Sequence, residues 1–297
     1  MSQSRWWLLL AALAPWAAQA EVFYFVIGGL GGESRYEERF SSYADSLANA
    51  ARRSVSDESR VRLLKGEQAT RDALRSEFVE LAASVAEADS LVVFLIGHGS
   101  YDGTLYKFNL PGPDIDGVEL GALLDAVPAK SQLVVNATSA SGAVLEDWAS
   151  DGRLLITATR SGAERNATRF AEHWAAALSS DESDLNKNGR VTAQEAFDYA
   201  SRKVADSYET EGTLATEHPQ LVGEAAGNFD VARLTARASE TPRIQALSTE
   251  LEGLESEIAT LRLRREDMPA DEYLAELQEL LVQLALVQQQ IDAARAE

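Results

Sequence analysis

Two short loops carry side chains that could perform acid–base or nucleophilic chemistry. The first contains His98, which stands between Gly97 and Gly99 directly after an apolar run. Glycines on both sides let the backbone approach a ligand closely, and a neutral imidazole can accept a proton near neutral pH. The second loop, further along the chain, contains Ser139. A serine next to a histidine base is the pairing used in acyl transfer, although a histidine at a strand end also serves purely structural roles.

A third segment, residues 184–195, has the oxygen spacing of a calcium loop. Polar side chains stand at positions one, three, five and twelve, a glycine at position six and a β-branched residue at position eight. The predicted ligands are Asp184, Asn186, Asn188, Arg190 (through its backbone carbonyl), Thr192 and Glu195. Ca²⁺ takes several oxygen ligands, and the glycine permits the sharp turn between them. This spacing matches the EF-hand loop and predicts a Ca²⁺ site.

The charge of this loop sets the expected strength of the site. Only Asp184 and Glu195 are carboxylates, since Asn186 and Asn188 are neutral. The sequence therefore predicts weak binding, with a Kd on the order of 10⁻⁴ M, as in extracellular modules. A single loop inside a larger domain is expected to clamp the structure rather than to switch it. A solvated turn rich in Asn, Asp and Gly is the alternative.

These loops need a scaffold that brings the ends of several strands together. Apolar runs that predict strands cover 21–27, 60–64, 91–96, 133–135 and 154–158. Helical patterns cover 36–53, 69–86, 118–126, 143–149, 165–178 and 193–206. Short, fully apolar strands between helices indicate a mostly parallel sheet covered on both faces. In such sheets the functional residues follow the carboxyl ends of strands, which points to loops 28–32, 97–103 and 136–142.

The strand-end motifs resemble the legumain branch of the caspase-like (clan CD) cysteine peptidases. The resemblance rests on His98-Gly99, then Ser139-Ala140-Ser141-Gly142, then Thr157-Ala158-Thr159-Arg160-Ser161-Gly162 after three successive strands, and spans about residues 21–210. It implies a caspase-like three-layer α/β/α sandwich. It also implies that His98 is the catalytic histidine, the Gly99 N–H an oxyanion donor, Ser139 the nucleophile position, and Thr159 and Arg160 part of the substrate pocket.

The chain departs from this family at the nucleophile. It contains no cysteine, and Ser139 stands at the cysteine position, or Thr138 if the alignment moves by one residue. A serine hydroxyl needs a base to take its proton and a third group to orient that base, for which Asp102 is a candidate. The resemblance thus implies a binding protein that has lost peptidase activity, with a hydrolase using Ser139 and His98 as the alternative. Arg160 would favour acidic groups in the pocket.

Composition and the N-terminal residues restrict the partners and the compartment. The 297 residues include 47 Asp+Glu and 27 Lys+Arg, a formal net charge of −20, which disfavours nucleic acid and anionic membrane surfaces. Residues 1–20 have the pattern of a signal peptide: Arg5, an apolar stretch over 6–14, and Ala18-Gln19-Ala20 before the cleavage point. An uncleaved anchor is the alternative. We expect an exported protein, periplasmic or secreted, without an integral membrane span.

After about residue 240, apolar residues follow heptad spacing. The predicted seam consists of Ile244, Leu247, Leu251, Leu254, Ile258 and Leu261, then Leu274, Leu277, Leu281, Leu284 and Ile291. Pro269 separates the two runs, so the spacing predicts an antiparallel coiled-coil hairpin, with one long kinked coil as the alternative. Such a hairpin leaves an apolar stripe that must pack on the main domain, a second copy or another protein.

Together these patterns predict three parts and one leading function. The parts are a signal peptide (1–20), a caspase/legumain-like α/β domain (21–240) containing the calcium loop, and a helical hairpin (241–297). The leading hypothesis is a non-catalytic, calcium-stabilised module that binds a protein or peptide through its cleft, its hairpin or both, and the hairpin could also form a homo-oligomer. An active hydrolase and a coiled-coil scaffold are the alternatives.

Overall fold

A six-stranded sheet forms the centre of the computed structural model, which describes residues 20–234, 241–265 and 268–296. The strands, in sheet order, are β10 (Gln220–Val222), β8 (Arg153–Thr157), β7 (Ser131–Asn136), β3 (Ser90–Ile96), β1 (Val22–Gly28) and β2 (Val61–Leu64). All neighbours pair in parallel except β10 and β8. The predicted mixed α/β class with a mostly parallel sheet is confirmed. Residues 1–19 of the predicted signal peptide lie outside the described residues.

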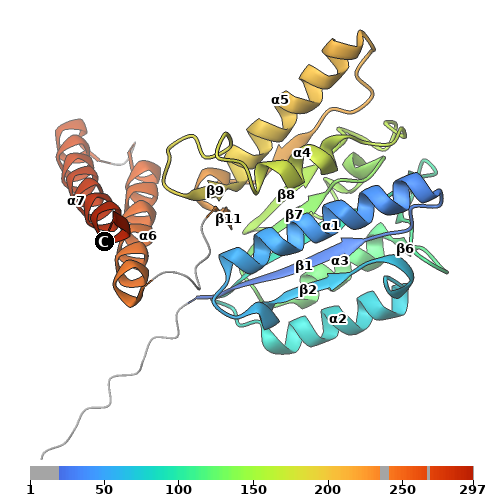
Figure 1. Cartoon of the computed structure of the whole chain (residues 1–297), viewed down its shortest axis with the longest axis horizontal. Helices are drawn as coiled ribbons and strands as arrows, with labels where there is room; N and C mark the ends of the chain where they lie inside the picture. Colours follow the sequence, from blue (N-terminus) through green and yellow to red (C-terminus); the bar gives the residue numbers. More distant parts are fainter. Residues whose placement is uncertain (1–19, 235–240, 266–267, 297) are drawn as a thin grey trace, which may run out of the picture.

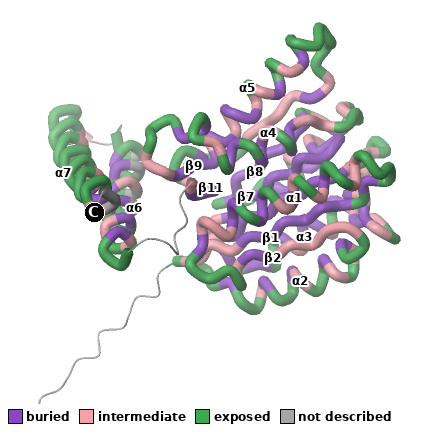
Figure 2. The backbone as a smooth tube through the Cα atoms, viewed as in Figure 1, coloured by how far each residue is buried: buried purple, intermediate pink, exposed green. Residues whose placement is uncertain are grey.

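Helices cover both faces of this sheet (Figure 1). Side chains alternate along β1, so that Tyr24 and Val26 enter one apolar core while Phe25 and Ile27 enter the other. The first core packs against α1 (Ser34–Ser54), α4 (Phe170–Ala177) and α5 (Ala193–Glu211), and the second against α2 (Arg71–Ser84) and α3 (Gly117–Ala126). Figure 2 shows the central strands buried along most of their length. The two covered faces explain why the strands are continuously apolar.

Two small antiparallel sheets accompany the large one. The first follows His98 and consists of β4 (Gly99–Tyr101), β5 (Tyr106–Phe108) and β6 (Ile115–Asp116). The second pairs β9 (Arg190–Thr192) with β11 (Asp230–Arg233). Short 3₁₀ helices at Glu58–Arg60, Gly66–Gln68 and Ala226–Asn228 (η4) occupy connections. The sequence patterns did not indicate either small sheet, because their strands are only two to four residues long.

The helix predicted over 143–149 is wrong. A 3₁₀ helix, η3 (Ser141–Val144), and turns occupy this region. Trp148 explains the difference, because its ring is fully buried against α3 and its Nε1 donates to the Gly117 carbonyl oxygen at 2.8 Å. The backbone of residues 143–149 adopts the conformation that buries the Trp148 ring. Tertiary packing thus overrides the local preference of this segment for a helix.

The last two helices, α6 (Pro242–Leu263) and α7 (Ala270–Ala296), pack side by side and are called the hairpin below. In Figure 1, α6 lies between α7 and the α/β domain. Their shared core comprises Leu251, Leu254, Val287 and Ile291, with Leu247, Leu280 and Leu284 packed against it. Thr241 caps α6 by accepting a hydrogen bond from the Ile244 N–H, and Pro242 follows at the first helical position. Among the described helices, none is long and apolar enough to cross a membrane.

The seam along α7 differs from the predicted one. Leu274 and Leu281, which the heptad pattern placed in the seam, are 59% and 45% exposed, whereas Leu280 and Val287 contact the hairpin core. The run Leu280-Leu281-Val282 puts apolar side chains on more than one face of α7. Heptad spacing alone therefore permits two registers, and contact with α6 selects one of them.

Candidate functional site

The strand-end loops meet at one edge of the large sheet. Strands β1, β3, β7 and β8 are parallel, and their last residues lie in register: Gly28 pairs with Ile96, Leu95 with Asn136, and Asn136 with Thr157. The loops that begin after Ile96, Asn136 and Thr157 therefore start from neighbouring positions.

Glycines allow these loops to approach one another very closely. A side chain at any of three glycines would overlap atoms of the next loop: Gly99 meets the Ser139 carbonyl oxygen, Gly142 meets the backbone of Thr159 to Ser161, and Gly162 meets the Tyr101 ring. No larger residue fits at these places without movement of the neighbouring loop. The structure thus brings His98-Gly99, Ser139–Gly142 and Thr159–Gly162 together.

His98 is half-buried between aromatic rings of α1. Its ring lies edge-on to Tyr36 and Phe40, with centroid distances of 4.8 and 5.0 Å. Burial lowers the pKa of His98, and a backbone hydrogen bond to Gly31 and the charge of Glu33 oppose this only in part. The lowered pKa favours the neutral imidazole, which is the form that accepts a proton.

The lowered pKa of His98 predicts that stability falls as the pH drops from about 7 to about 5. The pKa of His98 is lower in the folded than in the unfolded chain. At pH values between these two pKa values, the unfolded chain therefore binds more protons. Stability present above the unfolded pKa is lost as the pH falls through the folded pKa. Burial also lowers the pKa of His173, which acts in the same direction. Urea unfolding at both pH values should show a smaller pH dependence for His98→Gln than for wild type. Equal dependence in the two proteins would contradict this assignment.

The Ser139 hydroxyl is not joined to His98. Ser139 is 3% exposed, and within the described ranges no hydrogen bond links its side chain to the imidazole. Thr138, the other register, is fully buried, and its hydroxyl bonds to Asn136 Oδ1 at 2.8 Å and to the Tyr106 hydroxyl at 2.6 Å. Burial raises the pKa of Tyr106 to about 12, so its phenol stays protonated. Thr138 thus belongs to a buried polar network.

Asp102, the candidate to orient His98, closes a turn instead. Its Oδ1 accepts hydrogen bonds from the N–H groups of Thr104 and Leu105, both at 2.9 Å, between β4 and β5. These backbone bonds, that from Leu105 first, lower the pKa of Asp102. No contact between Asp102 and His98 occurs in the part of the chain that the structure describes.

Thr159 and Arg160, the predicted pocket residues, have different roles. Thr159 is fully buried, its hydroxyl accepts the Gly142 N–H at 2.9 Å, and its own N–H donates to Ser141 Oγ at 3.1 Å. It therefore fastens two strand-end loops together. Arg160 is exposed, and its Nε forms an ion pair with Glu164 Oε1 at 3.1 Å.

Glu164 is a site residue that the sequence analysis missed. Its nearly buried carboxylate accepts the Arg160 N–H at 3.0 Å and contacts His218 Nδ1 at 2.5 Å, and its carbonyl oxygen accepts the Ala140 N–H at 2.7 Å. The four-residue spacing from Arg160 was the available signal, whereas His218 is distant in sequence. Because Glu164 already partners Arg160, an acidic ligand must compete with it for the guanidinium.

The calcium loop folds around its own side-chain oxygens. Asp184 Oδ1 and Asn186 Oδ1 both accept the Asn188 N–H, at 3.1 and 3.0 Å, which brings these two oxygens close together. Asp184 Oδ2 accepts the Gly189 N–H at 2.9 Å, and Asn188 Oδ1 accepts the Arg190 N–H at 2.9 Å. Gly189 has a φ of +79°, the left-handed conformation that the sharp turn requires.

Glu195 returns to the start of this loop from the first turn of α5. Its Oε1 accepts the Leu185 N–H at 3.1 Å, and its Oε2 accepts the Thr192 N–H at 2.9 Å. Thr192 caps α5 in turn, since its hydroxyl accepts the Glu195 N–H at 3.2 Å. Glu195, at position twelve of the loop, is therefore held close to Asp184 at position one.

The donor set of this loop fits a calcium ion. Asp184 and Glu195 are only 3% and 8% exposed, yet no described Lys, Arg or His lies within ion-pair distance of either carboxylate. Burying two carboxylates in one loop without a cation is costly. Carboxylate, amide and carbonyl oxygens are the ligands that Ca²⁺ prefers. No group of three or more His, Cys, Asp or Glu with metal-site geometry occurs in the described residues, and this loop draws on two amides instead.

Comparison with protein-family models gives no match for this chain, and comparison with curated proteins gives none either. The strand-end loops and the predicted calcium loop are the features of this chain that bear on its function. At the first, Ser139 and His98 stand on adjacent loops, and among the described residues no hydrogen bond joins their side chains. At the second, two buried carboxylates lack a positive partner within the described chain.

Proposed function

We propose that this chain is an exported, calcium-stabilised homologue of the caspase/legumain-like peptidases that binds a protein or peptide without cleaving it. The observation that carries the proposal is the environment of the Ser139 side chain. It is buried, and within the described chain it has no hydrogen bond to His98, whose ring is held by Tyr36, Phe40 and Gly31. A hydrolase needs its nucleophile within reach of a base, whereas binding does not.

The arrangement of the α/β domain supports the caspase-like sandwich and its strand-end surface as the binding region. Helices cover both sheet faces, and the three motif-bearing loops contact one another at the carboxyl edge of the sheet. Exposed residues at these loops, which we call the strand-end surface, are Leu30, Gly32, Ser100, Asp102, Gly103 and Arg160. Arg160 is the basic residue of this surface and Asp102 the acidic one, so we propose that the partner presents an acidic side chain that takes the place of Glu164 at Arg160.

We expect a fluorophosphonate probe to leave the wild-type protein unlabelled. The probe reacts with serine hydroxyls that a neighbouring base activates, and Ser139 lacks that contact. A known serine hydrolase in the same reaction serves as the positive control. Labelling of wild type that Ser139→Ala abolishes would contradict the proposal and establish the hydrolase alternative, and labelling lost only in Thr138→Val would place the nucleophile at Thr138.

Affinity capture tests binding. The purified protein is immobilised as bait, and the proteins that it captures from the exported fraction are identified. Arg160→Glu should reduce capture of the partner, because it reverses the charge at position 160, which is exposed and not part of the core. Lys107→Glu, on the exposed side of β5, is the matched control for charge reversal. Capture that survives Arg160→Glu but is lost when residues 243–297 are deleted would favour the scaffold alternative.

A further inference from the structure

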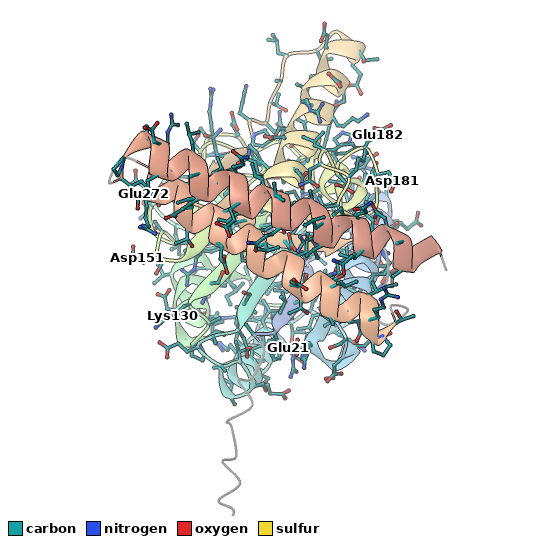
Figure 3. The ribbon with its side chains drawn as sticks, turned by 90° about the vertical axis from the view of Figure 1, so that its left-hand side faces the viewer. Glu21, Lys130, Asp151, Asp181, Glu182 and Glu272 are labelled. Carbon is teal, nitrogen blue, oxygen red and sulfur yellow. The ribbon has the colours of Figure 1, made fainter. Side chains whose placement is uncertain are left out.

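One contact joins the calcium loop to the hairpin. Glu255 on α6 accepts a hydrogen bond from Asn188 Nδ2 at 3.4 Å and forms an ion pair with Arg190 Nη2. Asn188 and Arg190 occupy positions five and seven of the calcium loop. Figure 1 places α6 beside β9 and β11, and Figure 3 shows the hairpin crossing in front of the α/β domain, with Asp181 and Glu182, just before the loop, above it.

The Asn188 amide is fixed at both of its ends. Its Oδ1 accepts the Arg190 N–H at 2.9 Å while its Nδ2 donates to Glu255. An ionised carboxylate only accepts hydrogen bonds, so it can bind the NH₂ end of the amide but not the oxygen. Glu255 therefore keeps the amide oxygen directed into the loop, where a calcium ligand at position five must point.

Arg190 is held from two sides. Its buried guanidinium forms an ion pair with Asp230 of β11 at 3.0 Å and with Glu255 of α6. The carbonyl of the same residue is the predicted ligand at position seven, so the side-chain contacts restrain the backbone that presents it. Glu255 thus contacts both of the predicted ligands nearest the hairpin, and it shares the restraint of Arg190 with Asp230.

Residues of the loop and of the hairpin face each other beside this contact. A cavity of about 10 Å³, the size of a single water molecule, lies between the loop and the hairpin. It is lined by Asn188, Gly189, Arg190 and Arg233 on one side and by Ser248, Leu251, Gln288 and Ile291 on the other. The direct contacts of Glu255 with Asn188 and Arg190 are therefore the route by which the loop and α6 can influence each other.

We propose that Glu255 is a positioning residue of the calcium site, so that calcium binding and docking of the hairpin stabilise each other. This proposal rests on the calcium site proposed above. Glu255 does not contact the ion itself but acts through Asn188 and Arg190. By thermodynamic linkage, the factor by which the docked hairpin raises calcium affinity equals the factor by which calcium favours docking.

Calorimetric titration of the full chain with CaCl₂ tests the first half of this coupling. We expect Glu255→Ala to weaken calcium binding about 10-fold, the lower end of the effects of residues that orient metal ligands. Glu257→Ala, which removes the same charge from an exposed position of α6, should bind like wild type. Glu255→Gln keeps an acceptor for Asn188 and should fall between them, and it replaces Glu255→Ala if that variant does not fold.

The effect of calcium on docking of the hairpin is tested by measuring the distance between two spin labels. The labels are attached to cysteines introduced at Ala246 on α6 and Glu209 on α5. Both positions are exposed, and the chain has no cysteine of its own. Calcium should narrow the distance distribution in wild type and do so less in Glu255→Ala. If wild type binds no calcium, the proposed calcium site fails. If wild type binds calcium and Glu255→Ala matches Glu257→Ala in both measurements, the site stands and the role of Glu255 is overturned.

Discussion

Calcium should raise the melting temperature of this protein by roughly 5 to 10 °C at a concentration about 100-fold above its Kd. At that excess, an ion that binds only the folded state adds about 2.7 kcal/mol to the free energy of unfolding. The reason lies in Asp184 and Glu195, which are buried without a described cationic partner, so that their mutual repulsion and desolvation weaken the loop until an ion compensates them. Glu195→Gln removes one of the two charges and should abolish the shift.

Thermal unfolding followed by circular dichroism, in about 10 mM CaCl₂ and then in EGTA, measures this effect, given a Kd on the order of 10⁻⁴ M. MgCl₂ at equal ionic strength separates specific binding from screening of the negative net charge. Glu209→Gln is the matched control, because Glu209 lies on the same helix as Glu195 and its side chain is exposed. An equal shift in Glu195→Gln and in wild type, or no shift in wild type, would contradict the assignment.

Gly142→Ala should lower the free energy of unfolding by about 2 to 3 kcal/mol, which is large for the addition of one methyl group. The added Cβ would overlap backbone atoms of Thr159, Arg160 and Ser161. Backbone cannot rotate away as a flexible side chain can, and hydrogen bonds from Thr159 to Ser141 and Gly142 hold the two loops together. Relief of the overlap therefore requires one strand-end loop to move and these hydrogen bonds to break.

Urea unfolding gives this difference in free energy, and Gly253→Ala is its control. Gly253 lies within α6 at an exposed position where an added Cβ meets no atom. Alanine is favoured over glycine in a helix interior by about 0.5 to 1 kcal/mol, so the same substitution should stabilise there. If Gly142→Ala did not lower the free energy of unfolding, the loops around Ser139 and Thr159 could not lie as close as the structure places them.

The central sheet was predictable because its signal is local and strong. Runs such as Leu91–Ile96 are short and apolar at every position, which is typical of a strand covered on both faces. The late strands β10 and β11 carry no such signal, since they are short and pair with β8 and β9 only through the folded chain. The register of α7 was ambiguous for a related reason, because apolar residues such as Leu281 occur outside the seam.

The two candidate sites also differ in how much of each could be predicted from local sequence. All predicted calcium ligands lie in one segment, so their spacing alone specified the loop. The surroundings of His98 come instead from α1 and from the loop after β1, and no spacing rule connects Tyr36, Phe40 and Gly31 with that histidine. Glu164 reaches His218 across 54 residues of sequence, a contact that exists only once β10 has paired with β8. Contacts of that kind follow from tertiary structure and not from local pattern.

The pairing of β9 with β11 has a consequence for how the protein responds to its surroundings. β9 is the strand inside the calcium loop, its Val191 is fully buried, and its partner β11 is an ordinary strand of the same chain. Two calcium loops that share such a ladder can influence each other's affinity, whereas the sequence around β11 does not have the spacing of a second calcium loop. The occupancy of the calcium loop should therefore rise gradually over nearly two orders of magnitude in calcium concentration, with a Hill coefficient of about one.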